Sequence, residues 1–297
     1  MNQSKSRKRF TFLCSFPALL LYIVFMVYPA ISVFVNAGYR WGGLSGNKEF
    51  IGFDNFAKIA SDEKFIRAFQ NTIFLIVIVS LVTMALAIVT AAILTREKLP
   101  GRNFYRIVLY IPNILSIAVV ASIFAAVYGM DDGLINGLLR KLHGEGFQNI
   151  PFLGRQNTVL YSIAGAMIWQ AMGYYMVMYM STMAQIPQPI YEAASLDGAG
   201  RLRQFFDFTI PLSWETIRTT LTFYIISNIN IAFQIIRVLT GGGPDGASAT
   251  LLNYMYSQAY DNSSYGYGLA IGVVVFLFSF GLAALVHKVT ERDLIQY

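Results

Sequence analysis

Charged residues are scarce in this sequence. Of its 297 residues, 13% are Asp, Glu, Lys or Arg, whereas 56% are hydrophobic. A soluble domain carries about 25% charged residues, so this chain has too few charges to keep its surface in water. Several charge-free runs exceed the roughly 20 residues that cross a bilayer core, and they are continuous rather than alternating, which argues against a membrane β-barrel. The composition therefore predicts an all-α polytopic membrane protein.

The residue patterns of common catalytic and metal sites are also missing. Cysteine occurs once, as Cys14, so an intramolecular disulfide is excluded. None of the eight lysines follows a glycine, so the G-x-x-x-x-G-K-[ST] phosphate cradle is lacking, and neither H-E-x-x-H nor G-x-S-x-G occurs. His143 and His287 lie far apart and are expected to be plain polar residues. We therefore expect no enzyme activity, no metal site and no cofactor bound by this chain.

The positive net charge of +6 has a simpler explanation than nucleic-acid binding. The Lys and Arg residues lie in loops beside apolar runs, where they set membrane orientation. We expect no nucleic-acid partner. The N-terminal "KSRKRF" resembles the start of a signal peptide, but the charge-free run that follows continues from Phe10 to Tyr39 without an A-x-A-like cleavage site. This run is predicted to be a retained first span.

Six runs with few or no charged residues are long enough to span a membrane. Together they predict one transmembrane domain over residues 1–297, with both termini on the same side. Placing the N-terminus inside puts twelve Lys and Arg residues in inner segments and nine in outer ones, and the excess favours cytoplasmic N- and C-termini. The predicted spans are about 12–37, 71–95, 107–128, 158–184, 211–236 and 267–286.

The connection between the fourth and fifth runs has an unusual composition. It reads "AQIPQPIYEAASLDGAGRLRQFFDFTIP" and faces the cytoplasm under this topology. Pro187 and Pro189 end the preceding helix and can open a new one, and Gly198 and Gly200 are expected to interrupt it with positive φ angles. The pattern predicts a helix–glycine–helix elbow over 188–208, whose alanine face can pack into the groove of another protein. An ordinary interfacial loop is the alternative.

A resemblance to a known family rests on this connection. Glu192-Ala193-Ala194, three residues, Gly198, nine residues and then 208–211, "FTIP", resemble the EAA motif of ABC importer permeases, EAA-x3-G-x9-I-x-L-P. Phe208 and Ile210 depart from it, each replacing one apolar residue with another. The segments "FPALLLYIVFMVYPAI", "FIGFDNFAKI", "LPGRNFYRIVLYIPNIL" and "LTGGGPDGASATLLNYMYSQAY" extend the likeness to carbohydrate-uptake (maltose-type) permeases. It covers nearly the whole chain, as a compact six-span form of the first permease of the pair.

The resemblance implies a machine of several subunits in a prokaryotic plasma (inner) membrane. The chain would be a multi-pass permease for a sugar or oligosaccharide, surrounded by membrane lipid. Its partners would be a second permease, two cytoplasmic ATPase subunits that bind ATP and Mg, and an extracytoplasmic solute-binding protein. The permease pair would be a heterodimer, with a homodimer as the alternative. The elbow would dock into an ATPase subunit. By position in the motif, the coupling residues would be Glu192, Ala193, Ala194, Asp197 and Gly198.

Polar residues in the fifth and fourth runs are candidates for the solute pathway. Those of the fifth run recur at spacings of three and four and span an arc of about 120° on a helix. Uncharged hydroxyl and amide groups suit hydroxyl-rich solutes, although they also hold membrane helices together. The candidates are Tyr224, Ser227, Asn230 and Gln234, aligned with Thr220, together with Gln170 and Tyr174 in the fourth run.

Two further sequence features have plain structural interpretations. Glu215 and Arg218 are spaced as an intrahelical ion pair, which we prefer to a gating role. The "GGGP" segment beginning at Gly241 predicts a turn in an outer loop.

Three other functions stay open. The same machine could carry glycerol 3-phosphate or another small solute, although a phosphate would favour cations in the pathway. An ion-coupled secondary transporter would favour ionisable residues at midmembrane, whereas the acids here lie near span ends. A sensory scaffold that signals through the elbow is the third alternative.

Overall fold

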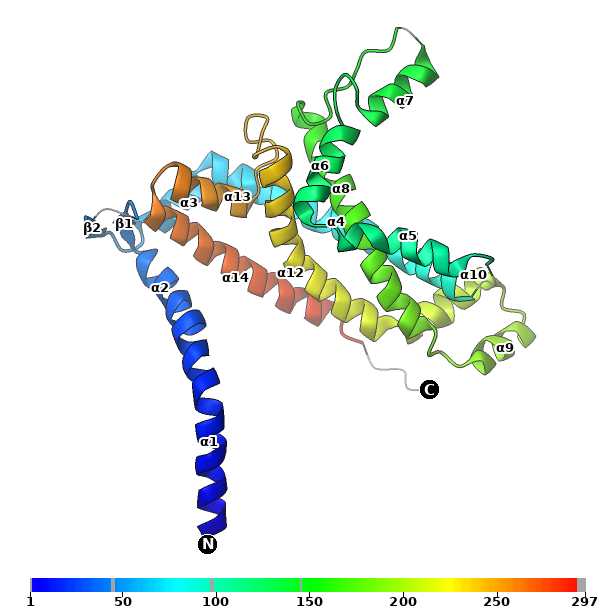
Figure 1. The fold of residues 1–297 in the computed structure, drawn as a ribbon, viewed down its shortest axis with the longest axis horizontal. Coiled ribbons are helices and arrows are strands. Elements are labelled where there is room, and N and C mark those ends of the chain that lie inside the picture. Colours follow the sequence, from blue (N-terminus) through cyan, green and yellow to red (C-terminus); the bar gives the residue numbers. More distant parts are fainter. Residues whose placement is uncertain (1, 44–45, 97–98, 145, 293–297) are drawn as a thin grey trace. The chain divides into compact units, whose positions relative to one another are not determined.

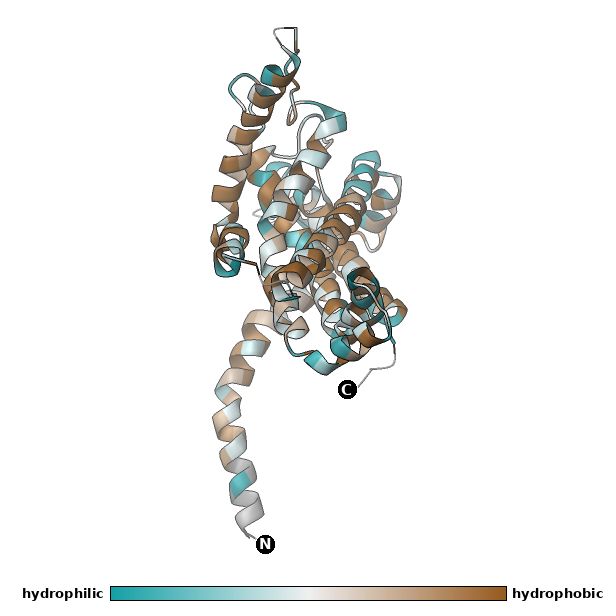
Figure 2. Ribbon diagram, turned by 90° about the vertical axis from the view of Figure 1, so that its right-hand side faces the viewer, coloured by the Kyte–Doolittle hydropathy of each residue, from teal (hydrophilic) through white to brown (hydrophobic). Residues whose placement is uncertain are grey.

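The computed structural model describes residues 2–43, 46–96, 99–144 and 146–292. Apart from one β-hairpin, the regular elements described are helical (Figure 1). The chain forms two compact units: unit 1 contains the residues up to Asp62 together with Tyr254–Leu277, and unit 2 contains Glu63–Asn253 and the residues from Phe278 onward. Hydrophobic residues run along the helices, and hydrophilic residues gather at their ends and in the connecting loops (Figure 2).

Unit 1 begins with a long helix over the first predicted span. Its apolar part, Phe10–Asn36, is long and apolar enough to cross a membrane. Pro29 has no N–H to donate along the helix, and a π-helical segment precedes it. The elements of this unit are α1 (Asn2–Tyr22), η1 (Ile23–Val27), α2 (Tyr28–Asn36), β1 (Tyr39–Trp41), β2 (Lys48–Phe50), α3 (Asp54–Ser61), η3 (Ser257–Asp261) and the first part of α14 (Tyr265–Val289).

Polar contacts hold the hairpin of unit 1 together and join the residue after α3 to α13 and α14. β1 and β2 pair antiparallel with Tyr39 opposite Phe50. The Asp62 carboxylate accepts hydrogen bonds from the hydroxyls of Tyr254 and Tyr267, both at 2.6 Å. Burial, and then the neighbouring Asp62 carboxylate, raise the pKa of the Tyr254 hydroxyl above its usual value. The tyrosine therefore stays a neutral donor to Asp62 at physiological pH.

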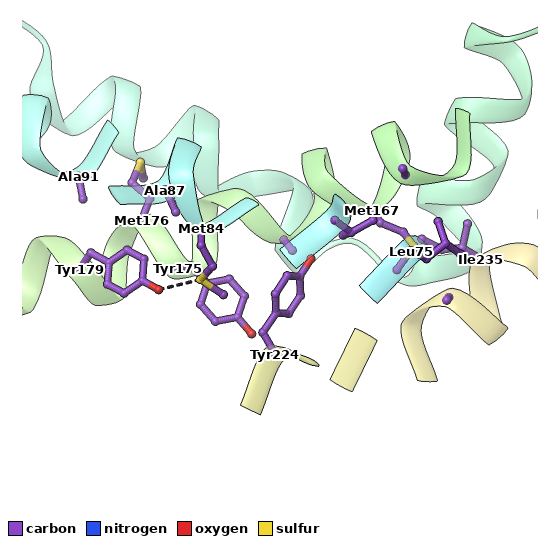
Figure 3. Packing of buried hydrophobic residues seen from close by; sticks show 14 of the residues in the cluster. Leu75, Met84, Ala87, Ala91, Met167, Tyr175, Met176, Tyr179, Tyr224 and Ile235 are labelled. Carbon is purple, nitrogen blue, oxygen red and sulfur yellow. Dashed lines mark hydrogen bonds between the residues drawn. The ribbon is translucent and has the colours of Figure 1, made fainter. Parts of the chain in front are cut away.

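Unit 2 holds the remaining helices around one apolar core. α8 packs against both α4 and α12, and Figure 3 shows the side chains where the three meet. The elements are α4 (Glu63–Arg96), α5 (Arg102–Ile114), α6 (Ile117–Val127), α7 (Leu134–His143), α8 (Gln156–Met183), α9 (Gln188–Leu196), α10 (Arg201–Gln204), η2 (Phe205–Thr209), α11 (Ile210–Leu212), α12 (Trp214–Leu239), the first half of α13 (Leu251–Tyr256) and the end of α14.

Tyrosines bring hydrogen bonds into this core. The Tyr179 hydroxyl shares a 2.7 Å hydrogen bond with Thr220 of α12 and lies 2.7 Å from the sulfur of Met84 in α4 (Figure 3). The Tyr224 hydroxyl of α12 shares a 3.3 Å hydrogen bond with Thr83 of α4. A polar group in a bilayer needs an internal partner because no water is available there. These bonds therefore fix α4, α8 and α12 in register.

Four of the six predicted spans match described helices that are long and apolar enough to cross a membrane. These are Phe10–Asn36, Glu63–Arg96, Trp214–Leu239 and Tyr265–Val289. The fourth predicted run, 158–184, forms α8, which is long enough but is not among these helices. Hydroxyl and amide side chains lower the hydropathy of α8, while neighbouring helices bury many of its residues. Six spans are therefore an expectation, and four are supported by both length and hydropathy.

The third predicted span, 107–128, is not one continuous helix. α5 and α6 meet at an angle of 103°. Pro112 lies near the end of α5, Leu115 is extended with ψ 142°, and the Ser116 hydroxyl caps α6 by accepting from the Val119 N–H at 3.4 Å. A serine cap satisfies a free N–H in the first turn of a new helix. A second helix can therefore begin at Ile117, within a run that has no charge. The predicted span is therefore broken into two helices at this point.

Candidate functional site

The predicted polar stripe of α12 divides between two environments. Thr220 and Tyr224 are buried in the core of unit 2, whereas Ser227, Asn230 and Gln234 are exposed. At about 100° per residue, the three exposed residues are rotated away from the buried face, which is centred near Asn228. The stripe therefore begins in the helix packing and ends on the surface of this chain.

The exposed part of the stripe forms a ridge with an aromatic residue at one end. Phe223, Ser227, Asn230 and Gln234, here called the α12 ridge, lie at spacings of four, three and four, so they share one face. All four are exposed. Sequence reasoning missed Phe223 because only polar side chains were sought. An apolar ring beside uncharged hydroxyl and amide groups can contact a sugar through its apolar face and its hydroxyls.

The two candidates in α8 differ in their exposure. Gln170 is buried, and its Oε1 has no partner among the described residues. Tyr174 is exposed and contacts Tyr175, whose ring lies 4.7 Å from that of Tyr224. Gln170 therefore faces the core, and only Tyr174 is exposed beside it. Both pathway assignments stay predictions.

The fully buried Asn228 of α12 was not among the sequence candidates. Neither polar atom of its amide has a hydrogen-bond partner in the described part of the chain. Ser80 of α4 is also buried with its hydroxyl unpartnered. Such groups are rare in folded proteins and are commonly satisfied by ordered water.

The elbow between α8 and α12 has the expected helix–glycine–helix form. Pro187 precedes α9, and Gly198, at φ +80°, follows it. The Ala199 N–H donates to the Ala194 carbonyl at 2.9 Å, a bond that closes a helix end whose glycine is left-handed. Gly200, however, has φ −68° and lies directly before α10, so it does not use the positive φ that a glycine permits. One left-handed residue is enough to end α9.

The elbow does not expose all the residues that the EAA motif implied for coupling. Glu192, Ala193, Asp197 and Gly198 are exposed, but Ala194 is only 3% exposed and packs within this chain. The same helix presents an apolar side chain that sequence reasoning missed, because Leu196 is 90% exposed. No signal in the sequence singles out this leucine, because the face that α9 exposes depends on its packing against the rest of the chain.

Two minor predictions concern the ends of α12. Arg218 donates from Nη2 to Glu215 at 3.3 Å, so the predicted intrahelical ion pair is present. Beyond the other end, Gly241 and Gly242 have positive φ angles of 61° and 96°, which confirms a turn. Within the described residues, no three His, Cys, Asp or Glu side chains converge as metal ligands would.

Side chains from α4 hold the loop that follows this turn. The buried Asn71 amide donates from Nδ2 to the carbonyls of Ala247 at 3.1 Å and Ala249 at 2.9 Å. Arg67 donates from Nη1 to the Asp245 carbonyl at 3.2 Å. The Thr72 hydroxyl accepts from the Leu251 N–H at 3.0 Å. The loop is therefore fixed to one face of α4.

Replacing Asn71 with alanine is expected to loosen this loop. Two hydrogen bonds are lost and two backbone carbonyls lose their donor, which costs about 1–3 kcal/mol. Amide hydrogen exchange over residues 242–251 should accelerate by about tenfold or more, while exchange in α8 stays unchanged. Asn103→Ala, at an exposed asparagine of α5, is the control. Unaltered exchange in Asn71→Ala would contradict the assignment.

Comparison with known proteins identifies the family. Residues 84–292 match the family described as "Binding-protein-dependent transport system inner membrane component". The diacetylchitobiose uptake system permease protein NgcF of Streptomyces coelicolor is 29% identical over 293 residues, covering 95% of this chain and 83% of that protein. The sn-glycerol-3-phosphate transport system permease protein UgpA of Agrobacterium fabrum is 27% identical over 276 residues, covering 93% and 92%.

A solved structure supports the fold. A chain from the crystal structure of a bacterial alginate ABC transporter, in complex with alginate pentasaccharide-bound periplasmic protein, has a TM-score of 0.85 at 21% identity. The match covers 98% of this chain and 99% of that chain. The structural likeness and the family match together show that the chain has the fold of a multi-pass membrane permease. The chain belongs to the family of inner membrane components of binding-protein-dependent transport systems.

Proposed function

We propose that this chain is one of two permease subunits of an ABC importer that moves a neutral sugar or oligosaccharide into the cell. An extracytoplasmic binding protein delivers the solute, and two cytoplasmic ATPase subunits bind ATP and Mg and supply the energy. The chain itself catalyses no reaction and binds no cofactor. Its termini and the elbow lie in the cytoplasm. The family membership supports the machine, and the α12 ridge supports the solute class.

The ridge needs a polar neighbour other than lipid. Asn230 and Gln234 lie in a helix long and apolar enough to cross a membrane, yet they are exposed on this chain. Polar side chains in a span face the bundle interior or a water-filled cavity, because exposure to hydrocarbon is costly. A second permease subunit, distinct from this chain, is proposed to cover this face. The space between the two subunits then contains both the ridge and water.

The chemistry of the ridge favours an uncharged solute over a phosphate. NgcF, by its name, serves diacetylchitobiose, whereas UgpA serves glycerol 3-phosphate. A phosphate is best bound by Arg or Lys, and the α12 ridge contains neither. Of the two cations on the same helix, Arg218 is paired with Glu215, and Arg237 lies in the last turn, beyond the four residues of the ridge. Neutral amides and a phenyl ring instead match sugar hydroxyls and the apolar face of a sugar ring.

Asn230→Leu and Gln234→Leu are each expected to reduce uptake by about three- to tenfold, because each removes a neutral hydrogen bond to the solute. Both side chains are exposed on this chain, so the amount of assembled complex should stay the same. Uptake of labelled solute into vesicles that contain the whole complex is the measurement. Val238→Leu, at an exposed apolar position of the same helix, is the control.

Two outcomes would overturn the proposal at different levels. Wild-type uptake by both leucine variants would reject the ridge as the solute contact. Uptake by the purified chain without any ATPase subunit would reject the importer and favour a secondary transporter. An ATPase subunit that copurifies and hydrolyses ATP without solute movement would favour the sensory scaffold.

A further inference from the structure

The elbow is attached to α4 through one arginine. Arg96 is the last residue of α4, and its Nη2 donates to Oε1 of Gln204 in α10. Its guanidinium carbon also lies 3.9 Å from the ring centroid of Tyr191 in α9. A charge-assisted hydrogen bond and a cation–π contact from one side chain are among the stronger polar links that a protein surface offers. Arg96 therefore contacts both helices of the elbow, α9 and α10.

Gln204 is the centre of the elbow's own hydrogen bonds. It is 5% exposed, and its Nε2 donates to the Ser195 hydroxyl and to the Ala199 carbonyl, both at 2.8 Å. The Ser195 hydroxyl in turn donates to the Tyr191 carbonyl at 2.8 Å. The amide is thus bonded on its oxygen and its nitrogen. A fully satisfied buried amide holds its neighbours in one arrangement.

The network continues to the segment that leads into α12. The Tyr191 hydroxyl shares a 3.1 Å hydrogen bond with the buried Thr209 hydroxyl, which donates to the Gln204 carbonyl at 3.3 Å. Thr209 ends η2, directly before α11 and α12. The elbow from Tyr191 to Thr209 is therefore one internally bonded body.

The elbow and α4 are not in close contact along their whole length. A cavity of about 650 Å³ lies beside the link, with Val89 and Ile93 of α4 on one side and Leu202 and Phe206 of the elbow on the other. Where two bodies are separated by a cavity, force passes between them at the points of contact. Arg96 supplies such a point.

The far end of this connection is the core of the bundle. Thr83 and Met84 lie on α4 about three turns before Arg96 and contact Tyr224 and Tyr179. Chain connectivity joins the elbow to α8 and α12, but it does not join it directly to α4. The packing of α4 against α8 and α12 joins them in the core, and the Arg96–Gln204 bond adds a direct link between the elbow and the end of α4.

We propose that Arg96 and Gln204 form a joint through which displacement of the elbow moves α4 together with α8 and α12. Both are positioning residues, since they are not proposed to touch solute or nucleotide. This inference rests on the proposed function, because it needs an ATPase subunit that displaces the elbow. It adds that the side chains of Arg96 and Gln204 transmit the displacement of the elbow to α4.

The test is the coupling between ATP hydrolysis and uptake in the whole complex, reconstituted in vesicles. In Arg96→Met, the stimulation of ATP hydrolysis by the solute-loaded binding protein is expected to fall by about tenfold, as the loss of a charge-assisted hydrogen bond implies. The thermal midpoint of the complex should stay close to wild type, because Arg96 is partly exposed. Arg96→Lys keeps the charge but not the planar group over Tyr191, so it should restore only part of the stimulation.

A double-mutant cycle separates a joint from two independent stabilising residues. If Arg96 and Gln204 act through one link, Arg96→Met combined with Gln204→Met should be no worse than the poorer single variant. Arg102→Met, at an exposed arginine of α5, is the matched control and should retain wild-type stimulation. Wild-type stimulation in Arg96→Met, or additive losses in the double variant, would overturn the joint. A wild-type complex without any stimulation would instead overturn the proposed function.

Discussion

Replacing Leu196 with aspartate is expected to remove most ATP-driven uptake while leaving the permease folded in the membrane. Leu196 is 90% exposed at the end of α9, so its removal costs this chain little packing. If the elbow docks into an ATPase groove, burial of this leucine contributes about 1.5–3 kcal/mol, and a buried carboxylate adds a further penalty. The affinity for the ATPase subunit should fall by at least about a hundredfold, since 1.4 kcal/mol represents a factor of ten.

Copurification of the ATPase subunit with the tagged permease measures this loss directly, and uptake into vesicles measures its consequence. Leu142→Asp is the matched control, because Leu142 is also highly exposed but lies on α7 between α6 and α8. That connection is expected on the outer side, away from the ATPase. Full retention of the ATPase by the Leu196 variant would show that α9 docks through another face or does not dock.

The elbow illustrates what local sequence determines. Proline before α9 and glycine after it define the two ends of that helix through backbone geometry alone, and both ends were predicted. The face that α9 turns toward its own chain depends on tertiary packing. The motif therefore directed attention to Ala194, which the fold buries, and away from Leu196, which it exposes.

The spans show a similar division. A long charge-free run is enough to predict α4, α12 and α14, since crossing a bilayer core demands mainly length and hydrophobicity. Neither hydropathy nor a count of charges shows where a helix bends. The bend between Pro112 and Ser116 was therefore not predicted from the charge-free run. The charge-free run 158–184 also predicted α8, although hydroxyl and amide side chains keep the hydropathy of this helix below that of the other spans.

Contacts between distant residues could not be predicted at all. Arg96 and Gln204 are separated by 108 positions, and neither belongs to a recognisable pattern. In the sequence, Arg96 is one more cation at the inner end of a span, and orientation alone explains it. Its stacking on Tyr191 becomes visible only once α4 and the elbow are folded beside each other.

Gly173→Ala, which adds one methyl group, is expected to destabilise unit 2 strongly. A Cβ at Gly173 of α8 would lie 1.9 Å from the Leu109 carbonyl oxygen and 2.8 Å from the Tyr110 Cα, both backbone atoms of α5. Backbone atoms cannot rotate away as a side chain can, so the two helices must separate. Small residues permit such close approach between membrane helices. The cost should reach about 3 kcal/mol, the upper part of the range for overpacking.

The same substitution at Gly137 should have the opposite sign, which makes it a strict control. Gly137 lies inside α7, and a Cβ there would meet nothing within 4 Å. Alanine is favoured over glycine in a helix interior by about 1 kcal/mol, so Gly137→Ala should be neutral or stabilising. Thermal unfolding of the purified permease in detergent compares the two variants. Equal midpoints would mean that α5 and α8 can move apart without cost, and that the bent pair α5–α6 is not anchored at Gly173. A lower midpoint in Gly173→Ala alone would show that the close backbone contact between α8 and α5 at Gly173 stabilises unit 2.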